Sequence, residues 1–84
     1  MDLSDAVLGD HAVEQMAKRE ISEAEVRGVL AQPEEIRPVR SGRVVAQGMV
    51  GRYLLRVSVD VDRHPPEVVT VYRTSQIRKY RTRP

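Results

Sequence analysis

Residues 43–60, RVVAQGMVGRYLLRVSVD, decide the fold of this chain. Gly51-Arg52 separates two stretches of alternating side chains, and a two-residue loop with glycine first is typical of a type II′ β-turn. Such a loop sets Val50 opposite Tyr53 and pairs the remaining residues outward from them. One face of both strands then carries only apolar residues, glycine or tyrosine. Because a slip of one residue would exchange the two faces, the pattern predicts an antiparallel hairpin with this register.

Two further strands are predicted on either side of this hairpin. A Ser-Gly pair is a turn signal, so residues 35–40 precede it as a strand, and residues 67–74 (EVVTVYRT) follow a Pro-Pro loop as the last strand. The sheet is therefore expected to be antiparallel with about four strands. Residues 75–80 are expected to form a last helical turn and residues 81–84 a frayed tail.

The first part of the chain has a helical pattern. Apolar residues recur at helical spacing in residues 10–19. Ser22 and Glu25 have the spacing of a capping box, which predicts a second helix that ends before Pro33. The side chains expected to face the sheet are Ala12, Val13, Met16 and Ala17 in the first helix and Val26, Val29 and Leu30 in the second.

These elements predict one α+β domain over residues 1–84, with helices at about 10–31, strands at about 35–74 and a basic C-terminal tail at 75–84. Two short helices cannot bury their apolar faces alone, so both are expected on one face of the sheet. A chain of this length buries roughly 60% of its unfolded surface, so the core is expected to be thin.

Composition excludes several classes of protein. The chain has no cysteine, which excludes disulfide scaffolds, thiolate nucleophiles and cysteine-based zinc sites. No apolar run approaches the roughly 18 residues of a membrane span, and the first residues lack the basic segment of a signal peptide. We therefore expect a cytoplasmic protein with no membrane partner. Neither a phosphate loop nor a complete metal-binding pattern is present in the sequence, so we expect no metal and no cofactor.

Charge is distributed unevenly along the chain. Residues 1–36 hold nine acidic and three basic residues, whereas residues 37–84 hold three acidic and eleven basic residues. Twelve of the fourteen basic residues are arginine, whose forked guanidinium suits phosphate. A basic half of this kind indicates an anionic partner, most commonly nucleic acid. The alternative is an ordinary solvated surface that uses arginine in place of lysine.

Three polar residues line one side of the first predicted helix. His11, Gln15 and Arg19 are spaced at i, i+4 and i+8. A histidine can act as general acid or base near neutral pH, and Arg19 could stabilise charge that develops on a phosphoryl oxygen. The alternative is that all three form the polar edge of an amphipathic helix.

A second candidate cluster follows the last predicted strand. Arg73, Arg78, Lys79 and Tyr80 place cations and a phenol at its end. In RNA cleavage, such a cluster can hold the scissile phosphate while the 2′-hydroxyl attacks it. Neighbouring positive charge can also lower the pKa of a tyrosine or lysine enough for it to act as a base. The alternative is a basic cap that offsets a helix dipole.

The face of the sheet away from the helices is mixed in character. It is expected to carry Gln47, Arg56 and Ser58, joined by Thr70, Tyr72 and Thr74 if the last strand buries Val69 and Val71. An open, partly basic face with a tyrosine suits a nucleotide backbone. The alternative is a solvated sheet face, which alternation predicts for many antiparallel sheets.

Four segments together resemble a known family. HAVEQMAKREIS and EVRGVLAQPEEI resemble its opening pattern, HAxERMxERGIS followed by EVxxVLxxPEE, while GRYLLRVSVD and VVTVYRTSQIRKY resemble its last two strands and tail. The similarity runs from about His11 to Tyr80. On these motifs the chain resembles a small bacterial domain-of-unknown-function family that is grouped with the RelE-like toxins, including the BrnT-type ribonucleases.

This resemblance implies a RelE-like fold, metal-independent cleavage of messenger RNA and a partner antitoxin. By position, His11 and Arg19 match the family's first-helix His and Arg. The closing motif is matched by Thr70, Tyr72, Lys79 and Tyr80. Two positions depart from the pattern, because Gln15 stands where arginine is typical and Glu20 stands where glycine is typical. If that arginine contacts phosphate, its loss would weaken activity.

Two hypotheses of function follow. The first is a RelE-like, toxin-type endoribonuclease that cleaves RNA, free or on the ribosome, by general acid/base catalysis with arginine charge stabilisation. Its catalytic residues would be His11, Arg19, Tyr72 and Lys79. Its RNA-binding residues would be Arg52, Arg56, Thr70, Arg73, Arg78 and Tyr80. The second is a non-catalytic module of the same fold that binds RNA or a protein.

Overall fold

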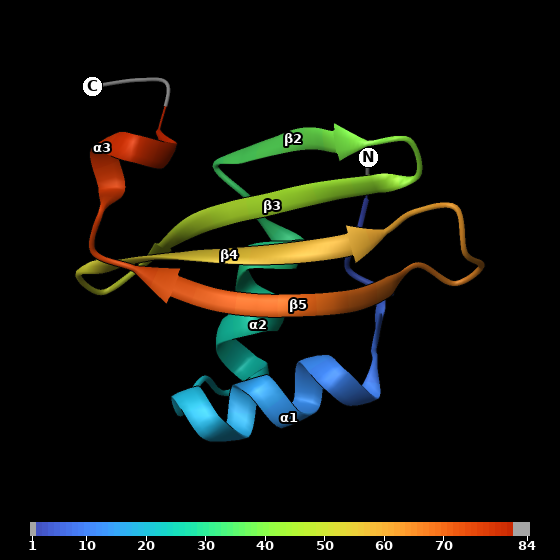
Figure 1. Ribbon diagram of the computed structural model, residues 1–84, viewed down its shortest axis with the longest axis horizontal. Helices are drawn as coiled ribbons and strands as arrows, with labels where there is room; N and C mark the ends of the chain where they lie inside the picture. Colours follow the sequence, from blue (N-terminus) through green and yellow to red (C-terminus); the bar gives the residue numbers. More distant parts are fainter. Residues whose placement is uncertain (1, 82–84) are drawn as a thin grey trace.

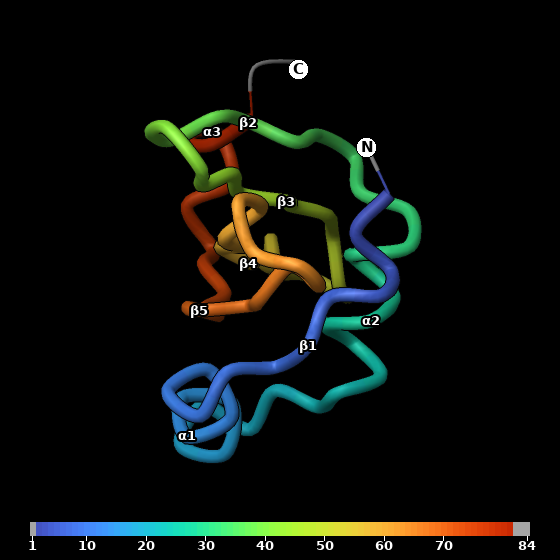
Figure 2. The backbone as a smooth tube through the Cα atoms, turned by 90° about the vertical axis from the view of Figure 1, so that its right-hand side faces the viewer, coloured from blue at the N-terminus to red at the C-terminus, as the bar shows by residue number. Residues whose placement is uncertain are grey.

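A computed structural model describes residues 2–81 and contains a five-stranded sheet of order β1-β5-β4-β3-β2 (Figure 1). The elements in chain order are β1 (Val7–Leu8), α1 (Asp10–Arg19), α2 (Glu23–Ala31), β2 (Glu35–Arg40), β3 (Arg43–Val50), β4 (Tyr53–Asp60), β5 (Glu67–Thr74) and α3 (Ile77–Tyr80). The helix α2 and the C-terminal segment lie on opposite sides of the sheet (Figure 2). The fold is therefore α+β, with the two long helices before the sheet.

The central hairpin has the predicted register. Each of the eight residues of β3 pairs with the expected residue of β4, from Val50 opposite Tyr53 at the turn to the far ends of both strands. Gly51 has φ +61° and a side chain there would meet no atom within 4 Å. Glycine is therefore needed at position 51 for its backbone conformation and not for space. A positive φ at the first turn position alone is the pattern of a type II′ turn.

Both predicted helices form where local signals placed them. Ser22 and Glu25 make a complete capping box, in which the Ser22 side chain accepts from the Glu25 amide and the Glu25 carboxylate accepts from the Ser22 amide. In α1, Ala12 and Met16 are buried. The prediction that Val13 and Ala17 face the sheet is wrong, because Val13 is 48% exposed and Ala17 is also exposed. The buried stripe of α1 is narrower than its apolar pattern.

The sheet has five strands rather than about four, and it is mixed rather than purely antiparallel. The additional strand β1 pairs in parallel with the start of β5. A two-residue strand is too short to show any alternation, so the sequence pattern could not reveal it. Leu3 and Ala6, which precede it, are each 1% exposed and belong to the main core.

A β-bulge in β5 changes which valine is buried. The register between β4 and β5 shifts after Ser58, so Val59 pairs with Val68 while Ser58 pairs with Thr70. Val68 and Val71 are therefore fully buried, whereas Val69, which was expected inside, is only half-buried. A bulge places two residues of one strand opposite one residue of the other, which alternation alone does not predict.

The sheet face opposite α2 is not simply open to solvent. Leu54 and Gln47 are buried there at 0% and 1% exposure, although neither belongs to the main core cluster. The segment after β5 covers them: residues 77–80 form α3, as expected for a last helical turn, and Arg81 is ordered by contacts described below. The rest of the tail that was expected to fray, residues 82–84, lies outside the described residues. Among the helices of residues 2–81, none is long and apolar enough to cross a membrane.

Candidate nucleic-acid interface

A row of polar side chains crosses the sheet on the face that α3 covers. Glu35, Gln47, Arg56 and Tyr72 come from β2, β3, β4 and β5, and each pairs in register with the next. Cross-strand neighbours of this kind lie close enough for direct side-chain contact. Four consecutive strands thus contribute to one continuous polar row.

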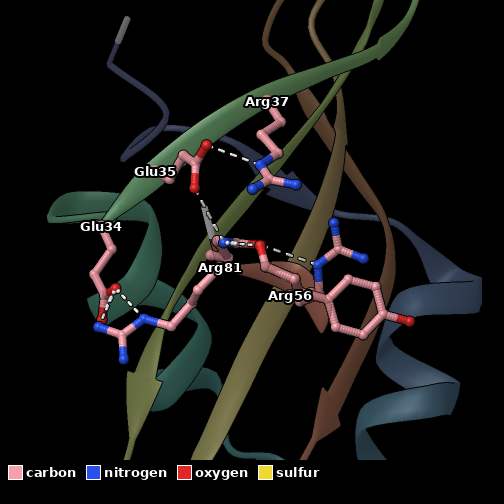
Figure 3. Close-up of polar contacts among 7 residues, drawn as sticks. Glu34, Glu35, Arg37, Arg56 and Arg81 are labelled. Atoms are coloured by element: carbon pink, nitrogen blue, oxygen red, sulfur yellow. Dashed lines mark hydrogen bonds and ion pairs between the residues drawn. The ribbon is translucent and has the colours of Figure 1, made fainter. Parts of the chain in front are cut away.

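Hydrogen bonds connect the members of this row. Gln47 Nε2 donates to Glu35 Oε1 at 3.4 Å and to the Tyr80 carbonyl at 3.0 Å, while Gln47 Oε1 accepts from Arg56 Nε at 3.1 Å (Figure 3). Arg56 Nη1 donates to the Tyr72 hydroxyl. Because buried amide groups need partners on both sides, Gln47 holds β2, β4 and the C-terminal segment together.

The C-terminal segment packs directly on the row. The Arg56 guanidinium lies 4.1 Å from the centroid of the Tyr80 ring, and the Tyr72 and Tyr80 rings meet edge to face with centroids 6.3 Å apart. Arg81 donates from Nε and Nη2 to Glu34 Oε1, at 3.1 and 2.8 Å (Figure 3). Arg56 therefore lies between two tyrosines, and contacts at Tyr80 and Arg81 hold the segment after β5 on the row.

The two tyrosines differ in acidity. Burial raises the pKa of Tyr72, although the Arg56 guanidinium partly opposes this effect. Hydrogen bonding to the Tyr72 hydroxyl lowers the pKa of Tyr80, and the charges of Lys79 and Arg56 lower it further. Positive charge stabilises a phenolate, so Tyr80 is the more readily deprotonated of the pair.

Gln15 and Arg19 close the outer edge of β5 beyond the short strand β1. The Val71 amide donates to Gln15 Oε1 at 3.1 Å, and Arg19 Nη1 donates to the Val71 carbonyl at 2.6 Å. One turn of α1 thus satisfies both backbone groups of Val71 on the side of β5 that faces away from β4, where β1 no longer pairs. An arginine at position 15 would have no acceptor for the Val71 amide, so Gln15 has a structural role here.

A shallow groove runs between the end of α1 and β5. It has a volume of about 540 Å³ and is lined by Lys18, Arg19, Glu20, Tyr72 and Arg73. Arg73 Nη1 donates to the Glu20 carbonyl at 3.4 Å. Glu20 ends α1 with φ 56°, a left-handed conformation that favours glycine.

Other predicted residues lie around this groove and the polar row. Lys79 Nζ is 5.3 Å from the centroid of the Tyr80 ring. Arg52, in the hairpin turn, and Arg78 in α3 are exposed, and neither has an ion-pair partner within residues 2–81. Thr70 pairs with Ser58 on the same face as Tyr72.

His11 is separate from the other candidates. It is exposed at the start of α1, two turns before Arg19, a distance of about 12 Å along the helix axis. No hydrogen bond or ion pair to His11 occurs within the described part of the chain. The structure therefore brings together Arg19, Tyr72 and the C-terminal cluster but leaves His11 outside this group.

Sequence reasoning missed the roles of Gln47, Lys18 and Tyr53. The signal for Gln47 was its place between apolar neighbours opposite Arg56, since a lone amide in a buried strand needs partners. Lys18 and Tyr53 offered no such signal, because their neighbours come from β5. No cluster of three acidic, histidine or cysteine side chains within residues 2–81 is arranged to hold a metal ion.

A family model described as a domain of unknown function, DUF4258, matches residues 8–73. The chain belongs to this family. The match ends inside β5, so Lys79 and Tyr80 lie beyond the matched part of this DUF4258 chain. No curated protein and no solved structure matches the chain.

Proposed function

We propose that this DUF4258 protein binds single-stranded RNA and cleaves it without a metal. The observation that carries the proposal is the gathering of cations and two tyrosines in contact at one end of the sheet. Arg19 and Arg73 border one groove, and Tyr72 links that groove to Arg56 and Tyr80. Cations that track a backbone, together with aromatic rings on which bases stack, are the usual means of binding single strands.

The proposed cleavage uses the RNA 2′-hydroxyl as the nucleophile. Its oxygen bonds to the adjacent phosphorus while its proton passes to Tyr80, whose lowered pKa suits a base. The bond to the 5′-oxygen breaks, and Lys79 protonates that leaving oxygen. The products are a 2′,3′-cyclic phosphate and a 5′-hydroxyl. Arg19 and Arg73 stabilise the negative charge of the transition state.

Tyr80 replaces Tyr72 as the favoured proton acceptor in this scheme. The Tyr72 hydroxyl already accepts from Arg56, and burial raises its pKa. A catalytic role for His11 has less support than in our sequence-based hypothesis, because this side chain lies two turns of α1 away from Arg19. We retain His11 as a residue to be tested.

The resemblance to RelE-like and BrnT-type toxins adds a biological setting to the proposal. In that setting the protein acts in the cytoplasm, cuts messenger RNA that is free or on the ribosome, and is neutralised by an antitoxin protein. These expectations rest on the resemblance of the sequence motifs, whereas RNA binding rests on the groove and the polar row.

A second function, a non-catalytic RNA- or protein-binding module, is favoured by one specific observation. Arg56 and Tyr72 bond to each other, and Arg56 also binds Gln47, so these groups are engaged within the protein. Such a network can stabilise the fold without taking part in any reaction. On this reading the exposed cations bind an anionic partner and nothing is cleaved.

The two functions are distinguished by incubating the purified protein with single-stranded RNA in EDTA. We expect cleavage by the native protein and none by Tyr80→Phe, a variant that keeps the ring on Arg56 but lacks the hydroxyl. His11→Ala is expected to retain cleavage, and its loss would return His11 to the mechanism. RNA binding that weakens with salt but gives no products, on free RNA or on translating ribosomes, would establish the binding module instead.

A further inference from the structure

Tyr53 is unusually exposed for its place in the sheet. By register it belongs to the face that carries Leu55, yet it is 46% exposed whereas Leu55 is 2% exposed. The Arg73 guanidinium lies 5.5 Å from the centroid of its ring. An aromatic face beside a cation is a binding element for a planar, anionic ligand.

A small cleft lies beside this ring. It is lined by Ile21, Glu25, Val50, Tyr53, Leu55 and Arg73 and has a volume of about 60 Å³. This space holds a few water molecules, so it can admit the edge of a planar ring but not a whole base. The rest of the ligand's ring would lie across the mouth of the cleft and stack on Tyr53.

The lining of the cleft also includes an acceptor, the carboxylate of Glu25. Glu25 Oε1 accepts from the Ser22 amide at 2.8 Å and from the Ser22 hydroxyl at 3.2 Å. Oε2 of Glu25 accepts no hydrogen bond from any residue in the range 2–81. The capping box therefore fixes the carboxylate and leaves one oxygen available for a donor.

The cleft and the groove of the candidate interface share one lining residue. Arg73 lines both, with Tyr53 on one side and Tyr72 on the other. A strand whose phosphate contacts Arg73 would therefore bring the neighbouring base toward Tyr53. The chemistry of the cleft matches that base: a stacking surface, a nearby cation and an acceptor for an amino group.

We propose that the cleft beside Tyr53 is a subsite for one base of the bound RNA, with a preference for bases that carry an exocyclic amino group. The inference rests on the proposed RNA binding and adds a site to it. An amino group can donate to Glu25, whereas the carbonyl oxygen that uracil carries in the corresponding position is repelled by the carboxylate. Cytosine and uracil have the same size, so their comparison isolates this contact.

The test measures binding of short, labelled 2′-O-methyl oligocytidine and oligouridine, which cannot be cleaved through the 2′-position, by fluorescence anisotropy at low salt. The native protein is expected to bind oligocytidine more tightly. Tyr53→Leu should weaken binding of both by about tenfold, because stacking is lost, while Tyr53→Phe should bind normally. Val39→Ala, which trims an exposed side chain on β2, is the matched control and should change nothing.

Glu25→Gln tests the base preference separately. Glutamine can also close a capping box, so the helix is expected to remain intact. Its amide both donates and accepts, and the variant should therefore bind the two oligonucleotides equally. Equal binding by the native protein, or unchanged affinity in Tyr53→Leu while salt-sensitive binding persists, would overturn the subsite but leave RNA binding in place. Failure of the native protein to bind either oligonucleotide would overturn both proposals.

Discussion

The basic residues at the two ends of the sheet differ in whether they form ion pairs. At the end formed by the β2–β3 turn and the β4–β5 loop, here named the paired end, Arg43 bonds to Asp60 at 2.6 Å, and Arg63 contacts Asp60 at 3.8 Å and Glu67 at 2.9 Å. The opposite end, at the β3–β4 turn and the end of β5, is named the open end (Figure 1). The ends of α1 and β5, the β3–β4 turn and α3 contribute its basic residues, which are Lys18, Arg19, Arg52, Arg73, Arg78 and Lys79. Within residues 2–81, Lys18 is the member of this set with an ion pair, at 3.7 Å to Glu14.

This contrast has a simple origin. All three acidic residues of positions 37–84, namely Asp60, Asp62 and Glu67, lie at the paired end. Of the basic residues in this half, Arg43 and Arg63 are paired there, whereas Arg52, Arg73, Arg78 and Lys79 at the open end have no ion pair within residues 2–81. Uncompensated cations raise the local concentration of anions, whereas paired cations mainly stabilise the fold. We accordingly expect substitutions at the two ends to affect different properties.

The largest expected effect is on stability at the paired end. Asp60 is nearly buried, and both of its carboxylate oxygens bond to Arg43, at 2.6 and 3.2 Å. Asp60→Ala should lower the free energy of unfolding by about 1 to 2 kcal/mol, because the guanidinium loses its partner. Urea denaturation measures this change. Arg52→Ala at the open end is the control, and a comparable loss there would contradict the contrast.

Lowering the pH should weaken the contact between Arg43 and Asp60. The loss in the free energy of unfolding should be part of that expected for Asp60→Ala. The hydrogen bond from Arg43 lowers the pKa of Asp60 below its ordinary value of 3.8. A carboxyl group whose pKa is lowered on folding contributes stability above its unfolded pKa, and this contribution is lost as pH falls through its folded pKa. The stability of the native protein should therefore drop more steeply below about pH 4 than that of Asp60→Asn. If the stability of the two proteins changes with pH in the same way, Asp60 does not cause the loss of stability in acid.

RNA affinity should respond at the open end. Arg73→Ala removes a cation from the groove and is expected to weaken RNA binding about fivefold to tenfold and to reduce the salt dependence by about one phosphate contact. Arg40→Ala removes the same charge from the β2–β3 turn and is the matched control. Anisotropy titrations at several salt concentrations measure both. Equal losses in the two variants would mean that net charge, and not the open end, governs binding.

The smallest expected effect is a gain in stability at the open end. Glu20 has a left-handed conformation at the end of α1. Glu20→Gly should stabilise the fold by about 0.5 kcal/mol, because glycine adopts this conformation without steric cost. Glu20→Ala keeps the steric cost and is the control for loss of charge. Thermal denaturation measures the difference, and greater stability of the alanine variant would contradict this explanation.

The hairpin and the helices were predictable because their signals are local. A glycine in the first turn position and alternation on both strands set the register of β3 and β4, and Ser22 with Glu25 set the start of α2. Candidate residues near the chain's end were found for a similar reason, since Arg73, Lys79 and Tyr80 are close in sequence. Their contacts with Arg56 and with α1 were not predictable, because these join residues that no turn connects.

Sequence by itself determined the α+β class, the two helices, four of the strands and the division of charge between the halves of the chain. Tertiary structure alone decided the parallel strand β1, the bulge that buries Val68, the position of α3 on the polar row and the closure of the β5 edge by Gln15 and Arg19. The physical reason is one of range. Turns, caps and alternation act between neighbours in the chain, whereas unpaired strand edges and buried amides are satisfied by whichever distant group the fold brings to them.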